Sequence, residues 1–143
     1  MAAVVKSTRA SYDALSVQTC VKITELFAGV KFAALDPVYI DSAGAVVVAV
    51  DVSTAVKFDG FSARGIDSDQ IGAPVTILSH GAIMEWLEDS DNYDPGTLFY
   101  VGVANELETT GRVPVAMAIN GREIVVIASP GVRRGSDGVA LPT

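Results

Sequence analysis

Residues able to carry out catalysis are few and isolated in this sequence. His80 is the only histidine and Cys20 the only cysteine among the 143 residues, so any serine or cysteine relay has to use one of them. His80 falls in a predicted turn, Ser79-His80-Gly81, where a general base would not be held rigidly. A zinc site normally needs several histidine or cysteine ligands. We therefore expect no catalytic residue, no metal ion and no cofactor.

Five carboxylates gather between Glu85 and Asp94, around Trp86 and Tyr93. A calcium loop needs oxygen ligands at regular spacing, a glycine for its sharp turn and a bidentate glutamate at its end. The run from Asp89 to Asp94 lacks both the glycine and that glutamate. We interpret it as a solvated acidic loop, which also discourages strands of different molecules from pairing edge to edge.

The composition argues against several classes of partner. The net charge is −7, from 10 basic and 17 acidic residues, whereas a nucleic-acid-binding protein would show a basic face. No segment approaches the roughly 20 apolar residues that cross a bilayer, so we expect no membrane contact. The lone cysteine implies no internal disulfide, and the N-terminus lacks a signal-peptide pattern. Either a cytosolic protein or one that is assembled into a virion fits these features.

The length and hydropathy suit a single domain with a core of its own. Half of the residues are hydrophobic and the mean hydropathy is +0.40. Two interpretations stay open. The excess apolar surface is buried either against partner molecules or inside a well-packed β core.

One strand–turn–strand design recurs three times. The segments 37–44, 74–81 and 114–121 each begin with Pro-Val and end with Gly, seven residues apart. Proline fits the first residue of a strand, and glycine closes a turn. In the third copy, Asn120-Gly121 is a strong hairpin signal. The pattern predicts a mainly β fold, a small antiparallel β-barrel or sandwich (β-tulip-like) built from hairpins.

Two further stretches refine this expectation. The alternation of Val17, Thr19, Val21 and Ile23 favours a strand over 17–24, since β-branched residues dominate it. The run Ala45–Val50 is apolar at every position, which indicates a strand covered on both faces.

The ends of the chain lack a clear period. We divide the sequence into an extended N-terminal arm (1–16), a β domain (17–129) and an irregular C-terminal tail (130–143) that carries Arg133-Arg134. The arm could become ordered on a partner, stay flexible or form an edge strand. If it serves a partner, removal of residues 1–12 should leave the domain folded and weaken binding.

An enzymatic alternative comes from the segment Gly65-Ile66-Asp67-Ser68-Asp69-Gln70-Ile71-Gly72. It resembles the uracil-pocket motif of trimeric dUTP pyrophosphatases. Ala10–Asp13 resembles another motif of that family, and Arg133–Gly135 resembles its C-terminal segment that closes over the phosphates. The resemblance implies an aspartate that activates water and a tyrosine that stacks on uracil. Gln70 stands where the aromatic residue is expected, and the family's phosphate-binding Arg-Ser-Ser loop is missing.

A second resemblance covers about residues 21–127. The segments 34–44 (A-L-D-P-V-Y-I-D-S-A-G), 58–77 (F-D-G-F-S-A-R-G-I-D-S-D-Q-I-G-A-P-V-T-I) and 93–102 (Y-D-P-G-T-L-F-Y-V-G) follow in the order found in bacteriophage head decoration, or capsid cement, proteins. The resemblance implies a β domain without enzymatic activity on the outer capsid surface. It also implies the major capsid protein and a homotrimer as partners.

A third alternative is a glycan- or peptide-binding β module of a phage surface structure, whose sign would be a row of exposed aromatic residues.

For the decoration protein, we expect apolar, aromatic and arginine side chains to contact the capsid or a neighbouring subunit. These are Val4, Val5, Arg9, Tyr12, Phe58, Phe61, Arg64, Trp86, Arg133 and Arg134.

Overall fold

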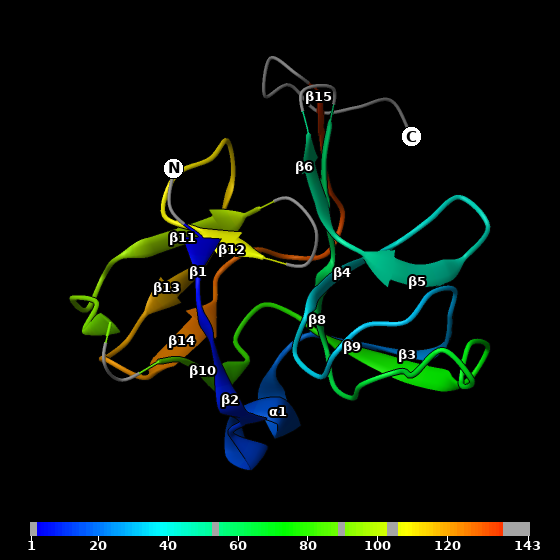
Figure 1. The fold of residues 1–143 in the computed structure, drawn as a ribbon, viewed down its shortest axis with the longest axis horizontal. Helices are drawn as coiled ribbons and strands as arrows, with labels where there is room; N and C mark the ends of the chain where they lie inside the picture. Colours follow the sequence, from blue (N-terminus) through cyan, green and yellow to red (C-terminus); the bar gives the residue numbers. More distant parts are fainter. Residues whose placement is uncertain (1–2, 53–54, 89–90, 103–105, 136–143) are drawn as a thin grey trace.

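The computed structural model of the chain describes residues 3–52, 55–88, 91–102 and 106–135. The fold is mainly β, as the hairpin pattern predicts, and its only α-helix in these ranges is α1 (Ala14–Thr19). The strands form an open sheet, a small closed barrel and a three-stranded ribbon (Figure 1).

The open sheet has seven antiparallel strands in the order β1-β12-β11-β13-β14-β10-β2. The two N-terminal strands therefore lie at its opposite edges. The strands are β1 (Ala3–Val4), β2 (Lys6–Tyr12), β10 (Ile83–Leu87), β11 (Leu98–Val101), β12 (Leu107–Glu108), β13 (Pro114–Ala118) and β14 (Glu123–Val126).

The barrel closes in the order β3-β5-β4-β8-β9. Its strands pair antiparallel except β3 and β5, which run parallel. Closure leaves the barrel without an unpaired edge. The strands are β3 (Lys22–Ala28), β4 (Pro37–Ile40), β5 (Ala45–Val48), β8 (Gly60–Ser62) and β9 (Pro74–Leu78).

The ribbon consists of β6 (Val50–Val52), β7 (Ala55–Phe58) and β15 (Val132–Gly135), with β7 in the middle. It projects from the rest of the molecule (Figure 1). Because β7 leads directly into β8 of the barrel and β15 follows the open sheet in sequence, the ribbon connects the two larger parts.

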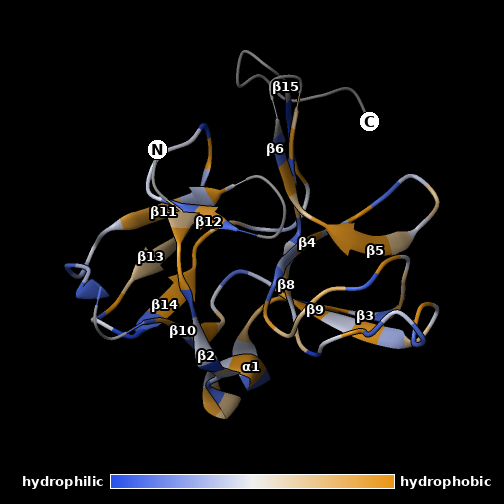
Figure 2. Ribbon diagram, in the orientation of Figure 1, coloured by the Kyte–Doolittle hydropathy of each residue, from blue (hydrophilic) through white to orange (hydrophobic). Residues whose placement is uncertain are grey.

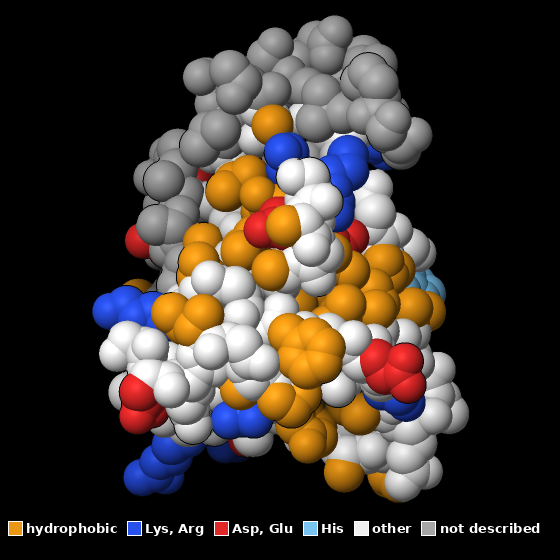
Figure 3. All heavy atoms as spheres, turned by 90° about the vertical axis from the view of Figure 1, so that its right-hand side faces the viewer, with side chains coloured by type: hydrophobic (Ala, Val, Ile, Leu, Met, Phe, Trp, Pro, Cys, Tyr) orange, Lys and Arg blue, Asp and Glu red, His pale blue; other side chains and the backbone are white. Residues whose placement is uncertain are grey.

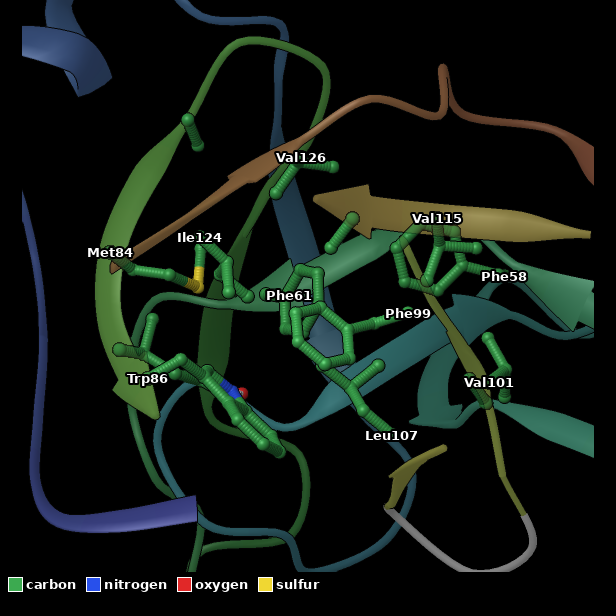
Figure 4. Packing of buried hydrophobic residues seen from close by; sticks show 14 of the residues in the cluster. Phe58, Phe61, Met84, Trp86, Phe99, Val101, Leu107, Val115, Ile124 and Val126 are labelled. Atoms are coloured by element: carbon green, nitrogen blue, oxygen red, sulfur yellow. Dashed lines mark hydrogen bonds between the residues drawn. The ribbon is translucent and has the colours of Figure 1, made fainter. Parts of the chain in front are cut away.

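Buried side chains form two clusters. The larger one fills the space behind the open sheet, where Trp86, Phe61, Phe99 and other side chains converge (Figure 4). Phe61 packs edge-on against both Phe58 and Trp86, with ring centroids 5.5 and 6.5 Å away. The indole Nε1 of Trp86 donates a hydrogen bond of 2.8 Å to the carbonyl of Leu35. The smaller cluster lies inside the barrel and contains Ala28, Phe32, Val38, Val46, Ile66, Val75 and Ile77.

Two of the three predicted hairpins are confirmed. β4 pairs with β5, and β13 pairs with β14. In the second hairpin, Asn120 Oδ1 accepts hydrogen bonds from the amides of Arg122 and Glu123, both at 2.9 Å. As Figure 2 shows, β5 is hydrophobic along its length, yet only Val46 of this strand is fully buried.

The hairpin predicted at residues 74–81 is wrong. β9 is already paired on both sides, by β3 and β8, so the chain cannot return beside it. It turns at Ser79 and crosses to the open sheet, where β10 pairs with β14 and β2. The Ser79 hydroxyl anchors this crossing, because it donates a 2.8 Å hydrogen bond to the carbonyl of Asp59.

The described part of the N-terminal segment supplies two strands, β1 and β2, to the open sheet and does not form a separate arm. Val4 is 4% exposed, packs in the larger core and pairs with Leu107. The third possibility left open by the sequence, an edge strand, is therefore the one observed. The strand escaped recognition because β2 is largely hydrophilic (Figure 2) and has no fully buried residue. Removing residues 1–12 would take away both edge strands of the open sheet, so the structure argues against the expectation that the remaining domain stays intact.

The strand predicted over 17–24 is wrong in its first half. Residues 14–19 form α1, because Asp13 caps the helix by accepting hydrogen bonds from the amides of Leu15 (2.8 Å) and Ser16 (3.3 Å). The strand begins only at Lys22. The C-terminal tail is likewise partly ordered, since residues 132–135 form β15 against β7. Residues 136–143 lie outside the described part of the chain.

Candidate interaction surface

A buried carboxylate fixes the base of the ribbon. Asp59, between β7 and β8, is 2% exposed. Its carboxylate accepts hydrogen bonds from both terminal nitrogens of Arg133 (2.7 and 3.2 Å), from the Gly131 amide (2.6 Å) and from the Ile40 amide (2.7 Å). These contacts satisfy the buried charge and attach β15 to the barrel.

Tyr39 packs beneath two cations at the same place. The Arg133 guanidinium carbon lies 5.3 Å from the centroid of the Tyr39 ring, and Lys57 Nζ lies 5.6 Å from it. Lys57 and Arg133 are direct cross-strand neighbours on β7 and β15. Like charges in that position repel, and the electron-rich ring and Asp59 offset the repulsion.

The outer face of the barrel carries an unusual exposed aromatic residue. Phe27, on β3, is 57% exposed. It lies opposite Pro74 on one neighbouring strand and Ala45 on the other. The same face continues over β5 and β4 with Val47, which is paired with Tyr39. We call these five residues, Phe27, Ala45, Val47, Pro74 and Tyr39, the outer barrel face.

The outer barrel face is apolar in the middle and cationic at one end. Figure 3 shows hydrophobic side chains gathered across this side of the molecule, with lysine and arginine above them. Full burial of a phenylalanine is worth about 1.5–3 kcal/mol, and more than half of the Phe27 side chain is still available to a partner. Aromatic and arginine side chains are enriched in protein–protein interfaces relative to the rest of the surface.

Two shallow pockets lie elsewhere on the surface. One, of about 310 Å³, is lined by Lys31, Phe32, Ala33, Asp36, Ile66 and Asp67. The other, of about 320 Å³, is lined by Glu85, Asn120, Gly121, Arg122 and Glu123. His80 is exposed and borders neither of them. Among the described residues, no three His, Cys, Asp or Glu side chains are grouped to hold a metal ion.

The loop that resembles the uracil-pocket motif is held in a closed turn. Ile66 pairs with Phe32 through two backbone hydrogen bonds of 2.8 and 3.0 Å. The side-chain oxygen of Gln70 accepts a 2.9 Å hydrogen bond from the Asp67 amide. Arg133, which the same resemblance assigns to phosphate binding, is bound to Asp59.

Four of the predicted contact residues are core residues. Val4 is 4% exposed, Trp86 is 1% exposed, and Phe58 and Phe61 are fully buried. Their predicted role as contacts is wrong, because a large apolar side chain in a strand is equally suited to a core. These residues were predicted as contacts from their side-chain type alone, and side-chain type does not tell which face of a strand is buried.

The other six predicted residues reach the surface but do not form one site. Val5 (59% exposed), Arg9 and Tyr12 (44% exposed) belong to the N-terminal segment at the edge of the open sheet. Arg64 donates a 3.4 Å hydrogen bond to the carbonyl of Pro74, at the border of the outer barrel face. On the ribbon, Arg133 contacts Tyr39 of that face, whereas Arg134 is the cross-strand partner of Val56 and lies on the other side of β15.

Sequence reasoning missed Phe27. The alternation of side chains along β3 could have predicted its exposure. Leu26 and Ala28 face the barrel interior, so Phe27 between them has to face outward.

The comparisons with known proteins add no relative. No protein-family model, curated protein or solved structure matches the chain. Within the described ranges, no helix is long and apolar enough to span a membrane. Any functional conclusion therefore depends on the residues of the chain itself.

Proposed function

We propose that this chain is a structural protein that works by association, binding the outer surface of an icosahedral phage capsid and cementing neighbouring capsomers. The major capsid protein would be its partner, with copies of the chain itself beside it as a homotrimer. The observation that carries the proposal is Phe27, a large aromatic side chain left more than half exposed on the outer face of a closed barrel.

The construction of the surface supports a binding role. The outer barrel face belongs to paired strands, so a partner would meet side chains that are already ordered, and the entropy lost on association would be small. The capsid as partner comes from the sequence resemblance over residues 21–127. Many copies on one shell would multiply a modest contact by avidity.

The dUTP pyrophosphatase alternative has one feature in its favour, the pocket of about 310 Å³ that Ile66 and Asp67 help to line. Against it, the pocket is shared with Lys31 and Phe32 rather than with the histidine, and Arg133 is already bound to a buried carboxylate. The glycan-binding alternative has less support. Phe27 and Tyr12, both exposed, lie in the barrel and the open sheet and do not form a row.

The proposal is tested on purified, expanded phage heads that lack the protein. Electron microscopy should show added density on the heads after incubation with the wild-type chain. Phe27→Ser should weaken the affinity for the heads at least tenfold, because a loss of about 1.4 kcal/mol of binding free energy raises Kd by a factor of ten. The matched control is Ile119→Ser, at an exposed apolar residue in the turn between β13 and β14, and this variant should bind as the wild type does.

Two results would contradict the proposal. Heads that stay bare at saturating protein would remove the capsid as partner. Turnover of dUTP by the purified chain, abolished by Asp67→Asn, would establish the enzymatic alternative instead.

A further inference from the structure

The surface beside Phe27 is lined by small residues. Gly29 lies just after β3, two positions beyond Phe27, and its amide donates a 2.8 Å hydrogen bond to the carbonyl of Val46 on β5. A Cβ added to Gly29 would lie 2.8 Å from the Cβ of Ala45 and 3.2 Å from Cγ1 of Val47, so the glycine belongs to the outer barrel face. The Phe27 ring therefore stands above its neighbours, which leaves room for an apolar side chain of a partner against its flank.

One positive charge at the end of the outer barrel face has no counterion in the described part of the chain. Lys57 and Arg133 both lie over the ring of Tyr39. Arg133 is paired with Asp59 at 2.7 Å, whereas Lys57 is partly exposed and makes no ion pair with any described residue. Two cations and one carboxylate leave this end with a net positive charge, although the whole chain has a net charge of −7.

The apolar and the cationic feature are held at a fixed separation. β5 lies between β3, which carries Phe27, and β4, which carries Tyr39, and it is paired with both. Because neighbouring strands are about 4.8 Å apart, Phe27 and Tyr39 are separated by about 10 Å across the barrel wall. A partner that contacts both features has to present two groups at a matching distance.

We propose that the outer barrel face binds a segment of the major capsid protein that presents an apolar side chain and, about 10 Å away, a carboxylate. The apolar side chain packs on Phe27, and the carboxylate pairs with Lys57. Charge complementarity favours an anion, since a cation there would be repelled and the carboxylate relieves the repulsion between Lys57 and Arg133. The inference rests on the proposed capsid-binding function and adds the chemistry of the partner.

Cross-linking on decorated heads tests the contact directly. A carbodiimide activates a carboxylate, and a lysine amine in contact with that carboxylate then forms an amide with it. Purified, expanded heads that lack the chain are incubated with the wild type, treated with the carbodiimide and analysed by mass spectrometry. We expect an amide between Nζ of Lys57 and an aspartate or glutamate of the capsid protein. Lys57→Arg keeps the positive charge, so it should still bind the heads, but it should lose this amide.

The affinity for the same heads gives the second measurement. At low salt, Lys57→Gln should raise Kd about threefold, and Lys57→Glu should raise it at least about tenfold. The affinity of the wild type should fall in about 1 M salt, where the Debye length is about 3 Å, and the affinity of Lys57→Gln should fall less. The matched control, Lys22→Gln, removes an exposed lysine at the start of β3 and should bind as the wild type does.

The outcomes separate this inference from the proposed function. Heads that bind the wild type and Lys57→Glu equally, or on which Lys57 forms no amide with the capsid protein, would overturn the inference and leave capsid binding in place. An amide between Lys57 and another copy of this chain would overturn it as well, because the occupant would then be a second copy. Heads that stay bare would remove both proposals. Thermal melting checks the folding of each variant, and the cross-link on the wild type keeps the test valid if a variant unfolds.

Discussion

The barrel and the open sheet solve the problem of unpaired strand edges in opposite ways. The barrel closes on itself and needs only seven buried residues to fill it. The open sheet has two edges, at β1 and β2, and its larger core contains most of the big side chains, among them Trp86, Phe99 and Met84. Because the closed barrel satisfies the hydrogen bonds of all its strands, it needs few buried apolar side chains. Apolar residues such as Phe27 can therefore face outward.

The comparison separates stability from binding. Alternate side chains point outward in both parts, but Phe27 of the barrel, at 57%, is the most exposed large apolar side chain of any described strand, ahead of Tyr12 and Leu98 of the open sheet at 44% and 37%. The two parts are nevertheless joined, because Phe61 of β8 packs against Trp86 of β10. Removing a side chain at this junction is therefore the strongest test of whether the barrel and the open sheet unfold together.

Trp86→Ala should have the largest effect on stability. Removing a fully buried tryptophan costs about 3–5 kcal/mol, and the Leu35 carbonyl would also lose its hydrogen-bond donor. Urea denaturation should show one transition at lower urea for both the open sheet and the barrel. Two separate transitions would mean that the junction does not couple the parts. Phe27→Ala, on the outer barrel face, serves as the aromatic control and should cost well under half as much.

Arg133→Ala should have an intermediate effect. It leaves the buried Asp59 carboxylate without its cation, which costs about 2–3 kcal/mol when the loss is discounted for the 25% exposure of the arginine side chain. Denaturation of Arg134→Ala provides the neighbouring control, and it should differ from the wild type by about 0.5 kcal/mol or less. Equal effects of the two substitutions would show that the ion pair contributes nothing.

The smallest effect concerns pH. The pKa of Tyr93 is raised above 10.0, mainly by burial and then by Asp91. The folded state therefore holds this proton more tightly than the unfolded chain. The corresponding stability is present below pH 10 and is lost as the pH rises through the folded-state value. Tyr93→Phe keeps the packing on Phe99 and should show a shallower loss of stability in alkaline melting curves, and an unchanged slope would argue against the shift.

Local signals predicted much of the fold. Proline at a strand start and a turn residue at its end placed β4–β5 and β13–β14 correctly, because such hairpins are set by residues close in sequence. The destination of β10 could not be found in the same way. It depends on β9 being paired on both sides by distant strands, and no local residue reports that.

The candidate surface was less accessible to sequence reasoning. Arg133 and Arg134 were singled out as a charged pair, but the partner of Arg133 is Asp59, 74 residues earlier. Residue type made Trp86 and Phe61 attractive as contacts, although both are buried. Which face of a strand is covered depends on its neighbours in space, and for Phe27 the deciding neighbours, Pro74 and Ala45, come from two other strands.

The Asp59–Arg133 pair also constrains the order in which the molecule can assemble. During synthesis Asp59 emerges 74 residues before the arginine that neutralises it, and β1 and β2 likewise precede their partners β12 and β10 by most of the chain. The barrel can form early from strands between residues 22 and 78, whereas β1, β2 and β15 pair only after later segments have been made. Folding of this chain is therefore completed late, and a chain cut short before Arg133 would keep a charged group sealed in an apolar interior.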